Sequence, residues 1–140
     1  MSEQNKAIAR KFIEGAWNQR DMSVVNQFVA PNHVSHGPFT EQLPKGSDGA
    51  AAFVTSFVTA FPDVKATIVK QEIDGDKVKT TVTFKGTQTG VLMDIPATSK
   101  LAIVPVVVTD RIVNGKIVET WSDWKPQDMF RQLGVKQIAK

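Results

Sequence analysis

The amino-acid sequence predicts an α+β fold in which helices come first and an antiparallel sheet follows. Apolar residues recur every three to four positions as far as Phe61, and every second position from Val64 onward. An Asn114-Gly115 pair, the favoured two-residue hairpin turn, then separates the last two strands. Helices and antiparallel strands that are segregated along the chain are typical of this class. The length of 140 residues fits one domain, which we expect to span residues 1–140.

The first part of the chain predicts three helices and one short strand. A first helix ends near Asn18, and Asp21 can cap a second, shorter helix. That helix ends at Ala30-Pro31, because a residue before proline disfavours helical backbone angles, and residues 33–38 form an extended segment. A third helix begins at Ser47 or Asp48, and its apolar stripe consists of Ala52, Phe53, Ser56, Phe57, Ala60 and Phe61.

Residues after Pro62 predict four strands and a final helix. Alternating patterns indicate strands over residues 64–73, 78–84, 101–113 and 116–124, with a longer glycine- and proline-marked connection over residues 86–99. Pro126 suits the first turn of a short helix that Gly134 stops. A curved sheet wrapped around a helix leaves a cone-shaped cavity, where small ligands tend to bind.

Composition excludes several kinds of site. The chain has no cysteine, so disulfides, thiolate catalysis and cysteine-ligated metals are excluded. It has no tyrosine to act as a phenolic acid. Its two histidines, His33 and His36, would fall on opposite faces of a strand, so we predict no metal site.

Charge patterning argues against nucleic-acid and membrane partners. The net charge of +3 comes from 17 basic and 14 acidic residues that are scattered along the chain, without a basic cluster among aromatics. The start has no apolar core of a secretory signal, and the longest apolar stretch, residues 101–108, is too short to span a bilayer. We therefore expect a cytoplasmic protein.

A set of short motifs, in a characteristic order, covers nearly the whole chain: Trp17-Asn18, Ala30-Pro31-Asn32, Val34-Ser35-His36, Phe61-Pro62-Asp63, Gly75-Asp76-Lys77-Val78, Gly86-Thr87-Gln88-Thr89-Gly90, residues 111–121 and Gln132-Leu133-Gly134. In this set the chain resembles the SnoaL-like polyketide cyclases, or ester cyclases, of the nuclear transport factor 2-like superfamily. The resemblance implies a cone-shaped α+β barrel (nuclear transport factor 2-like or cystatin-like). It also implies a cofactor-independent, aldol-type cyclisation or isomerisation of a polyketide-like β-keto ester by a carboxylate, a reaction of the lyase or isomerase class.

The chain departs from the family pattern at three places. Gln88 stands where the family usually has a histidine, and residues 97–99 read Ala-Thr-Ser in place of Pro-Thr-Gly. Lys125 stands where the family resemblance implies an acid/base aspartate, and the nearest carboxylate is that of Asp123. A base for enolisation needs a carboxylate with a raised pKa in an apolar pocket, together with a donor for the developing oxyanion.

Strand parity suggests where these groups lie. Ile117, Glu119, Trp121, Asp123 and Lys125 would share one face of the last strand, which we expect to be concave. The candidate catalytic residues are then Asp123 as acid or base and His36 as donor or second proton-transfer group. The candidate substrate-binding residues are Trp121, Gln88, Glu119, Trp17, Phe57 and Lys125.

Structural interpretations of these residues stay open. Asp123 could cap the final helix, and Lys125 could pair with Asp123 or Glu119 and hold the carboxylate ionised. His36 could be a structural histidine, and the three tryptophans could be core residues. Arg111 is expected to form an ion pair with Glu119 or Asp110.

Two functional classes therefore remain: a small-molecule cyclase or isomerase, and a non-catalytic domain of the same fold that binds a small apolar ligand or dimerises. Turnover of β-keto esters would distinguish them. We also expect a homodimer through the convex face of the sheet, on the interpretation that Val104, Val106, Val108 and Ile112 make that face too apolar for water.

Overall fold

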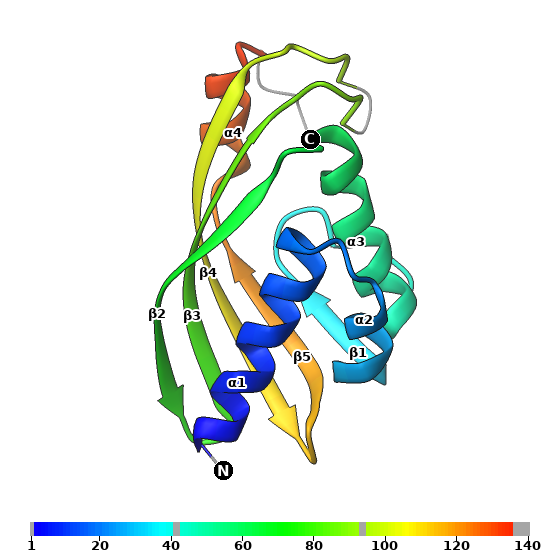
Figure 1. Ribbon diagram of the computed structural model, residues 1–140, viewed down its shortest axis with the longest axis vertical. Helices are drawn as coiled ribbons and strands as arrows, with labels where there is room; N and C mark the ends of the chain where they lie inside the picture. The colour runs from blue at the N-terminus through cyan, green and yellow to red at the C-terminus, as the bar shows by residue number, and fades with distance from the viewer. Residues whose placement is uncertain (1, 41–42, 93–94, 136–140) are drawn as a thin grey trace.

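The computed structural model describes residues 2–40, 43–92 and 95–135. Helices precede the sheet, and a last helix follows it (Figure 1). This order confirms the predicted α+β class. The elements are α1 (Ser2–Ile13), η1 (Glu14–Asn18), α2 (Ser23–Phe28), β1 (Val29–His36), α3 (Ser47–Ala60), β2 (Lys65–Asp74), β3 (Lys77–Thr87), β4 (Leu101–Val113), β5 (Lys116–Asp123) and α4 (Pro126–Leu133).

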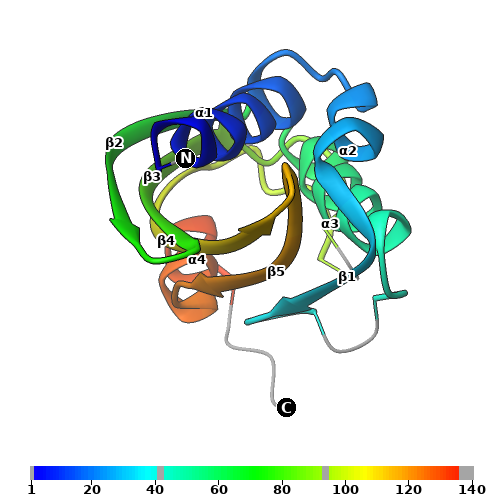
Figure 2. The same cartoon turned by 90° about the horizontal axis from the view of Figure 1, so that it is seen from below.

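The five strands form one sheet in the order β1-β5-β4-β3-β2. The pairs from β2 to β5 are antiparallel, as predicted, whereas β1 runs parallel to β5. Seen from below, the sheet is strongly curved, and α1 and α3 lie on its concave side (Figure 2). The parallel pairing of β1 makes the sheet a mixed one. β1 follows directly after α2 and lies at the edge of the sheet, where Pro31 is tolerated.

The core lies between the concave face of the sheet and the helices. Even-numbered residues of β4 point into it, because side chains alternate along a strand. Val104, Val106 and Ile112 are buried there, and Val108 packs against them. The interpretation of these four residues as a convex apolar surface is therefore wrong. Dimerisation stays a prediction, but these residues no longer support it.

A β-bulge in β5 decides which of its side chains face the core. Ile112 of β4 is opposite Ile117, but the preceding Arg111 is opposite Glu119, so Val118 is an extra residue in β5. Ile117 points inward and is 1% exposed. Beyond the bulge, the inward positions are therefore Thr120 and the alternate residues after it, not Glu119 and its alternates.

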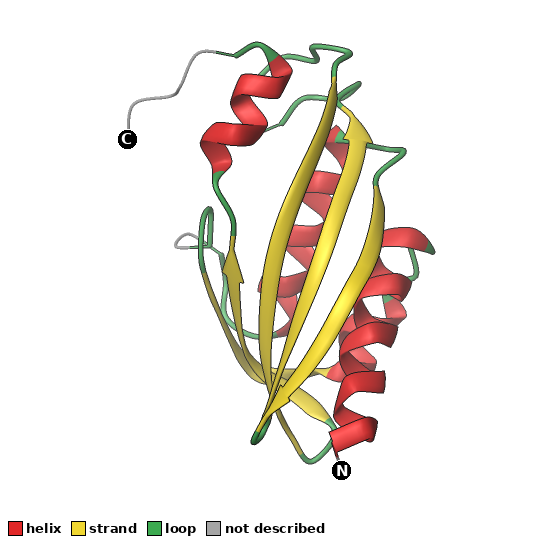
Figure 3. Ribbon diagram, turned by 90° about the vertical axis from the view of Figure 1, so that its left-hand side faces the viewer, coloured by secondary structure: helices red, strands yellow, loops and turns green. Residues whose placement is uncertain are grey.

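The last helix, α4, lies at the end of the molecule away from the N-terminus (Figure 3). The β5 register ends where Asp123 is opposite Val107, so residues 101–106 of β4 extend beyond it. There, the Gln132 amide donates to the Ile103 carbonyl at 2.9 Å and accepts from the Ile103 N–H at 2.7 Å. The side chain thus bonds to β4 as a neighbouring strand would. None of the helices in the described residues has the length and apolar character needed to cross a bilayer.

Gln88, at the end of β3, organises the connection to β4 and does not face an open space. Its side chain is 0% exposed. Its amide nitrogen donates to three backbone carbonyls between residues 90 and 96, and its carbonyl accepts a hydrogen bond from Thr98 at 2.8 Å. The predicted role of Gln88 in substrate binding is wrong, because these partners use its polar atoms.

We expect Gln88→Leu to lower the free energy of unfolding by about 3 kcal/mol, since it leaves buried backbone carbonyls without partners. The matched control is Gln132→Leu, which also removes a side-chain amide bonded to backbone, but at an exposed site where water replaces it. Its cost should stay below about 1 kcal/mol. Urea unfolding of the two variants measures both values. Equal losses would show that burial of the Gln88 amide does not matter.

Candidate active site

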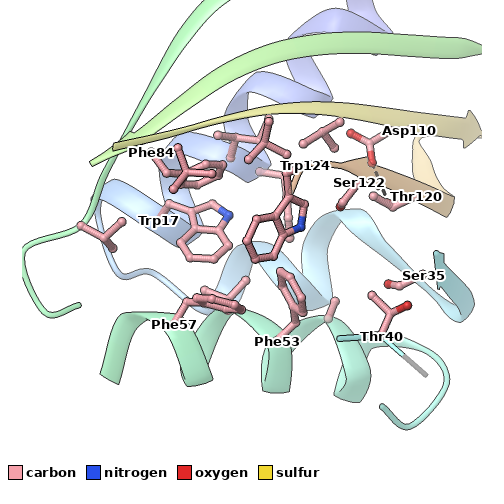
Figure 4. A pocket seen from close by; sticks show the side chains of 18 of the residues that line it. Trp17, Ser35, Thr40, Phe53, Phe57, Phe84, Asp110, Thr120, Ser122 and Trp124 are labelled. Carbon is pink, nitrogen blue, oxygen red and sulfur yellow. Dashed lines mark hydrogen bonds between the residues drawn. The ribbon is translucent and has the colours of Figure 1, made fainter. Parts of the chain in front are cut away.

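A pocket of about 140 Å³ lies between the concave face of the sheet and the helices α1, η1 and α3. A single water needs about 10–15 Å³ by a comparable measure, so the space suits an organic molecule. Its walls are mostly apolar, and β4 contributes side chains from alternate positions, as does β5 beyond its bulge. Figure 4 shows aromatic rings gathered toward one end and polar side chains toward the other.

Aromatic rings from separate elements form the apolar end. The indole of Trp17, from η1, lies 4.9 Å from the ring of Phe84 and 6.5 Å from the rings of Phe53 and Phe57, measured between centroids. Trp124, just after β5, has its ring 6.0 Å from that of Phe57. Edge-to-face contacts of this kind fix the ring orientations. Trp17 and Phe57, two residues predicted to bind substrate, therefore both line the pocket.

A hydrogen-bonded chain of three side chains forms the polar end, and Figure 4 shows two of them, Asp110 and Thr120. The Thr120 hydroxyl donates to Oδ1 of Asp110 at 2.7 Å, and Nε2 of His33 lies 2.9 Å from the same hydroxyl oxygen. Since the hydroxyl has one proton and donates it to Asp110, the His33 ring donates from Nε2. Ser35 and Ser122, from the two neighbouring strands, line the same end.

Burial shifts the two titratable groups of this chain in opposite directions. Asp110 is 3% exposed, and desolvation raises the pKa of its carboxyl to about 6, although the hydrogen bond from Thr120 acts the other way. Desolvation lowers the pKa of His33 to about 4, so the imidazole is neutral at pH 7. Asp110 therefore exchanges its proton close to neutral pH, whereas His33 stays a neutral hydrogen-bonding group.

Four of the predicted site residues lie on the outer face of the sheet instead. Because of the bulge at Val118, Glu119, Trp121 and Asp123 point away from the pocket, and Asp123 is exposed. His36 follows the same outward direction on β1, opposite Trp121. The predicted placement of Asp123, His36, Trp121 and Glu119 around the cavity is wrong.

These outward residues instead form an outer-face cluster, which consists of His36, Glu119, Arg111, Trp121 and Lys77. His36 bonds to Glu119 at 2.6 Å, its ring stacks on Trp121 at 5.3 Å, and Lys77 lies 5.1 Å from the Trp121 ring centre. Arg111 pairs with Glu119 at 3.4 Å, and Glu119 is one of the two partners predicted for Arg111. The hydrogen bond from His36 lowers the pKa of Glu119, so this carboxylate is a poor base.

Lys125 lies outside the pocket as well, so its predicted contact with substrate is wrong. It is exposed and immediately precedes α4. Among residues 2–40, 43–92 and 95–135, no three His, Asp or Glu side chains converge as metal ligands do.

Sequence reasoning missed Asp110, Thr120 and His33 as a group. One signal was present: Asp110 occupies an inward position in the alternation Ala102, Val104, Val106, Val108, Asp110, Ile112. A carboxylate in the apolar half of such a pattern indicates either a paired buried charge or a functional group. Thr120 had no such signal, because the alternation of residues along β5 does not reveal the bulge that turns Thr120 inward.

Comparison with solved structures supports the fold. TsrD from Streptomyces laurentii shares 22% identity with a TM-score of 0.85, covering 96% of this chain and 97% of that one. AclR from Streptomyces galilaeus, a proposed hydroxylase, shares 23% identity with a TM-score of 0.81, covering 100% and 87%. IdmH from Streptomyces antibioticus, a proposed polyketide cyclase, shares 27% identity with a TM-score of 0.79, covering 94% and 99%.

No curated protein sequence matches the chain. The family model of the SnoaL-like polyketide cyclases does match it, over residues 7–133, which include every strand and both ends of the pocket. The order of elements and the curved, unclosed sheet agree with the nuclear transport factor 2-like structures of that family. The chain therefore belongs to the SnoaL-like polyketide cyclase family.

Proposed function

We propose that this protein is a cyclase-type enzyme in which Asp110 moves a proton to and from a small, largely apolar carbonyl compound. The observation that carries the proposal is the buried Asp110 carboxyl at the end of an apolar pocket, with a pKa raised to about 6. At neutral pH such a group is mostly ionised and therefore accepts a proton, and its conjugate acid is strong enough to return one.

The reaction that fits this group is an aldol-type ring closure of a β-keto ester. The Asp110 carboxylate takes a proton from a carbon flanked by two carbonyls, and leaves an enolate. The enolate carbon forms a bond to a second carbonyl carbon of the same molecule, whose C=O π electrons move to oxygen. That alkoxide takes a proton back from the Asp110 carboxyl, so atoms and charge balance without a cofactor.

Thr120 and His33 support this proton transfer. The Thr120 hydroxyl bonds to one carboxylate oxygen of Asp110, which leaves the other oxygen for substrate. His33 fixes the hydroxyl in turn, since a neutral imidazole donates from Nε2 to Thr120. The mostly apolar pocket walls leave the carboxylate weakly solvated and therefore more basic.

The alternative is a non-catalytic domain that binds an apolar ligand in the same pocket. The observation that favours it is Lys125, which stands where the family resemblance implies an acid/base aspartate. A single variant separates the two functions, because proton transfer needs the Asp110 carboxyl and apolar binding does not.

We expect the protein to accelerate the exchange of the α-protons of a simple ketone, 2-tetralone, with D₂O. NMR follows this exchange. Asp110→Asn should reduce the accelerated part of this rate by about 10²–10⁴-fold, the usual contribution of a general base. The accelerated rate of the wild-type protein should rise with pH through about 6, since ionised Asp110 is the active form.

Asp123→Asn is the matched control, since it makes the same change on the exposed outer face of the sheet. It should leave the exchange rate unchanged. If 2-tetralone binds to the wild-type protein but is not exchanged faster than in buffer, the enzymatic proposal fails and the binding domain remains.

The raised pKa of Asp110 also predicts how stability depends on pH. Well below pH 4 the carboxyl is protonated in both the folded and unfolded chains. As the pH rises through about 6, ionisation is easier in the unfolded chain, so the wild-type protein loses stability relative to Asp110→Asn. The full difference should be about 3 kcal/mol.

Urea unfolding of both proteins at about pH 4 and about pH 7.5 measures this difference. The lowered pKa of His33 acts the opposite way, since its stabilisation is complete above about pH 6.5 and is lost as the pH falls through about 4. His33 is present in both proteins, so its contribution cancels in the comparison. A difference that does not change with pH would mean that Asp110 titrates normally.

A further inference from the structure

The indole N–H of Trp17 is a buried donor that faces the pocket and has no hydrogen-bond partner among the described residues. Trp17 is 8% exposed and lines the pocket. In the described part of the chain, its Nε1 donates no hydrogen bond. Every side-chain nitrogen or oxygen there that is fully buried has a hydrogen-bond partner. The nitrogen is therefore open to the pocket space, toward which it points in Figure 4.

We propose that the Trp17 N–H donates a hydrogen bond to a carbonyl oxygen of the bound molecule, and that the substrate is a flat, conjugated ketone with that oxygen at the aromatic end. This inference rests on the proposed function of the pocket and deepens it. Asp110 approaches the molecule from the polar end, and Trp17 holds its oxygen from the aromatic end (Figure 4).

Hydrogen bonds around Trp17 fix the backbone position from which its indole N–H points into the pocket. Trp17 lies in η1, a π-helical turn that continues directly from α1, and such turns are frequent at functional sites. Asn18, the next residue, clamps the turn to the edge strand β2, because its side chain accepts from the Ala66 N–H at 2.7 Å and donates to the Ala66 carbonyl at 2.9 Å. Arg20 adds a further bond to the Trp17 carbonyl.

The surrounding aromatic rings hold the Trp17 side chain in one orientation. Phe84 and Phe53 meet the Trp17 indole edge to face, from the sheet and from α3. The N–H thus cannot turn to water or to another protein group without displacing these rings. A donor held in an apolar space without an acceptor is costly, and a ligand oxygen removes that cost.

The same bond also has a place in the reaction. Negative charge develops on a carbonyl oxygen when a neighbouring carbon loses its proton, and a fixed N–H donor in an apolar site stabilises that charge. Of the protein's three tryptophans, Trp121 lies in the outer-face cluster. Trp121 is therefore the internal control for Trp17.

The test uses 9-fluorenone and fluorene, two flat tricycles that differ in the carbonyl group. Each is added to the ¹⁵N-labelled protein, and the three indole N–H resonances, assigned with Trp→Phe variants, are followed by NMR. We expect fluorenone to move the Trp17 proton resonance downfield well beyond the shift caused by fluorene. The Trp121 resonance should stay in place with both. The infrared C=O stretch of bound fluorenone should fall in frequency, and Trp17→Phe should abolish that fall whereas Trp121→Phe should not.

The outcomes separate this inference from the proposed function. If both tricycles bind and move the Trp17 resonance equally, or if the Trp124 resonance responds to the carbonyl instead, the inference is overturned and the role of Asp110 stands. If neither tricycle binds, the proposed ligand pocket fails and the inference fails with it. The wild-type NMR result does not depend on whether Trp17→Phe folds.

Discussion

The extra residue Val118 in β5 is the constraint on which the site depends. By shifting the strand by one position, it turns Thr120 inward and places its hydroxyl against Asp110. Without that bond, a carboxyl that is 3% exposed would face only apolar side chains on β4, and its neutral form would be favoured still more. The same shift turns Glu119 outward to Arg111 and His36. One bulge thus separates the carboxyl that can exchange protons from the carboxyl that is held ionised.

The fold could be predicted from the sequence because its signals are local and repeated. The change of apolar period after Phe61 and the Asn114-Gly115 turn each act through backbone geometry at neighbouring residues. The parallel pairing of β1 with β5 had no such signal, since it joins segments about 85 residues apart. The position of Phe57 agrees with its place in the apolar stripe of α3, whereas Thr120 depends on a bulge that a strict period of two cannot represent.

The departures from the family pattern have physical meanings in the structure. Gln88 offers both a donor and an acceptor at a fully buried point, and the connection between β3 and β4 uses both, so it is a structural group and not a site residue. Lys125 lies in the solvent before α4, where a charged side chain costs little. The polar end of the pocket is accordingly built from the inward positions of β4 and β5 and from His33 and Ser35 of β1.

The contact between Gln132 and Ile103 has a consequence for how the protein behaves at high concentration. Residues 101–106 of β4 continue beyond the end of β5, and an unpaired strand edge is a template for pairing with another chain. The Gln132 amide occupies the N–H and C=O of Ile103, and α4 lies over this stretch. Leu101 and Ile103 beside it are each 45% exposed, so the uncovered edge would also be apolar. The Gln132 amide and α4 therefore occupy part of an edge to which a strand of another chain would otherwise have access.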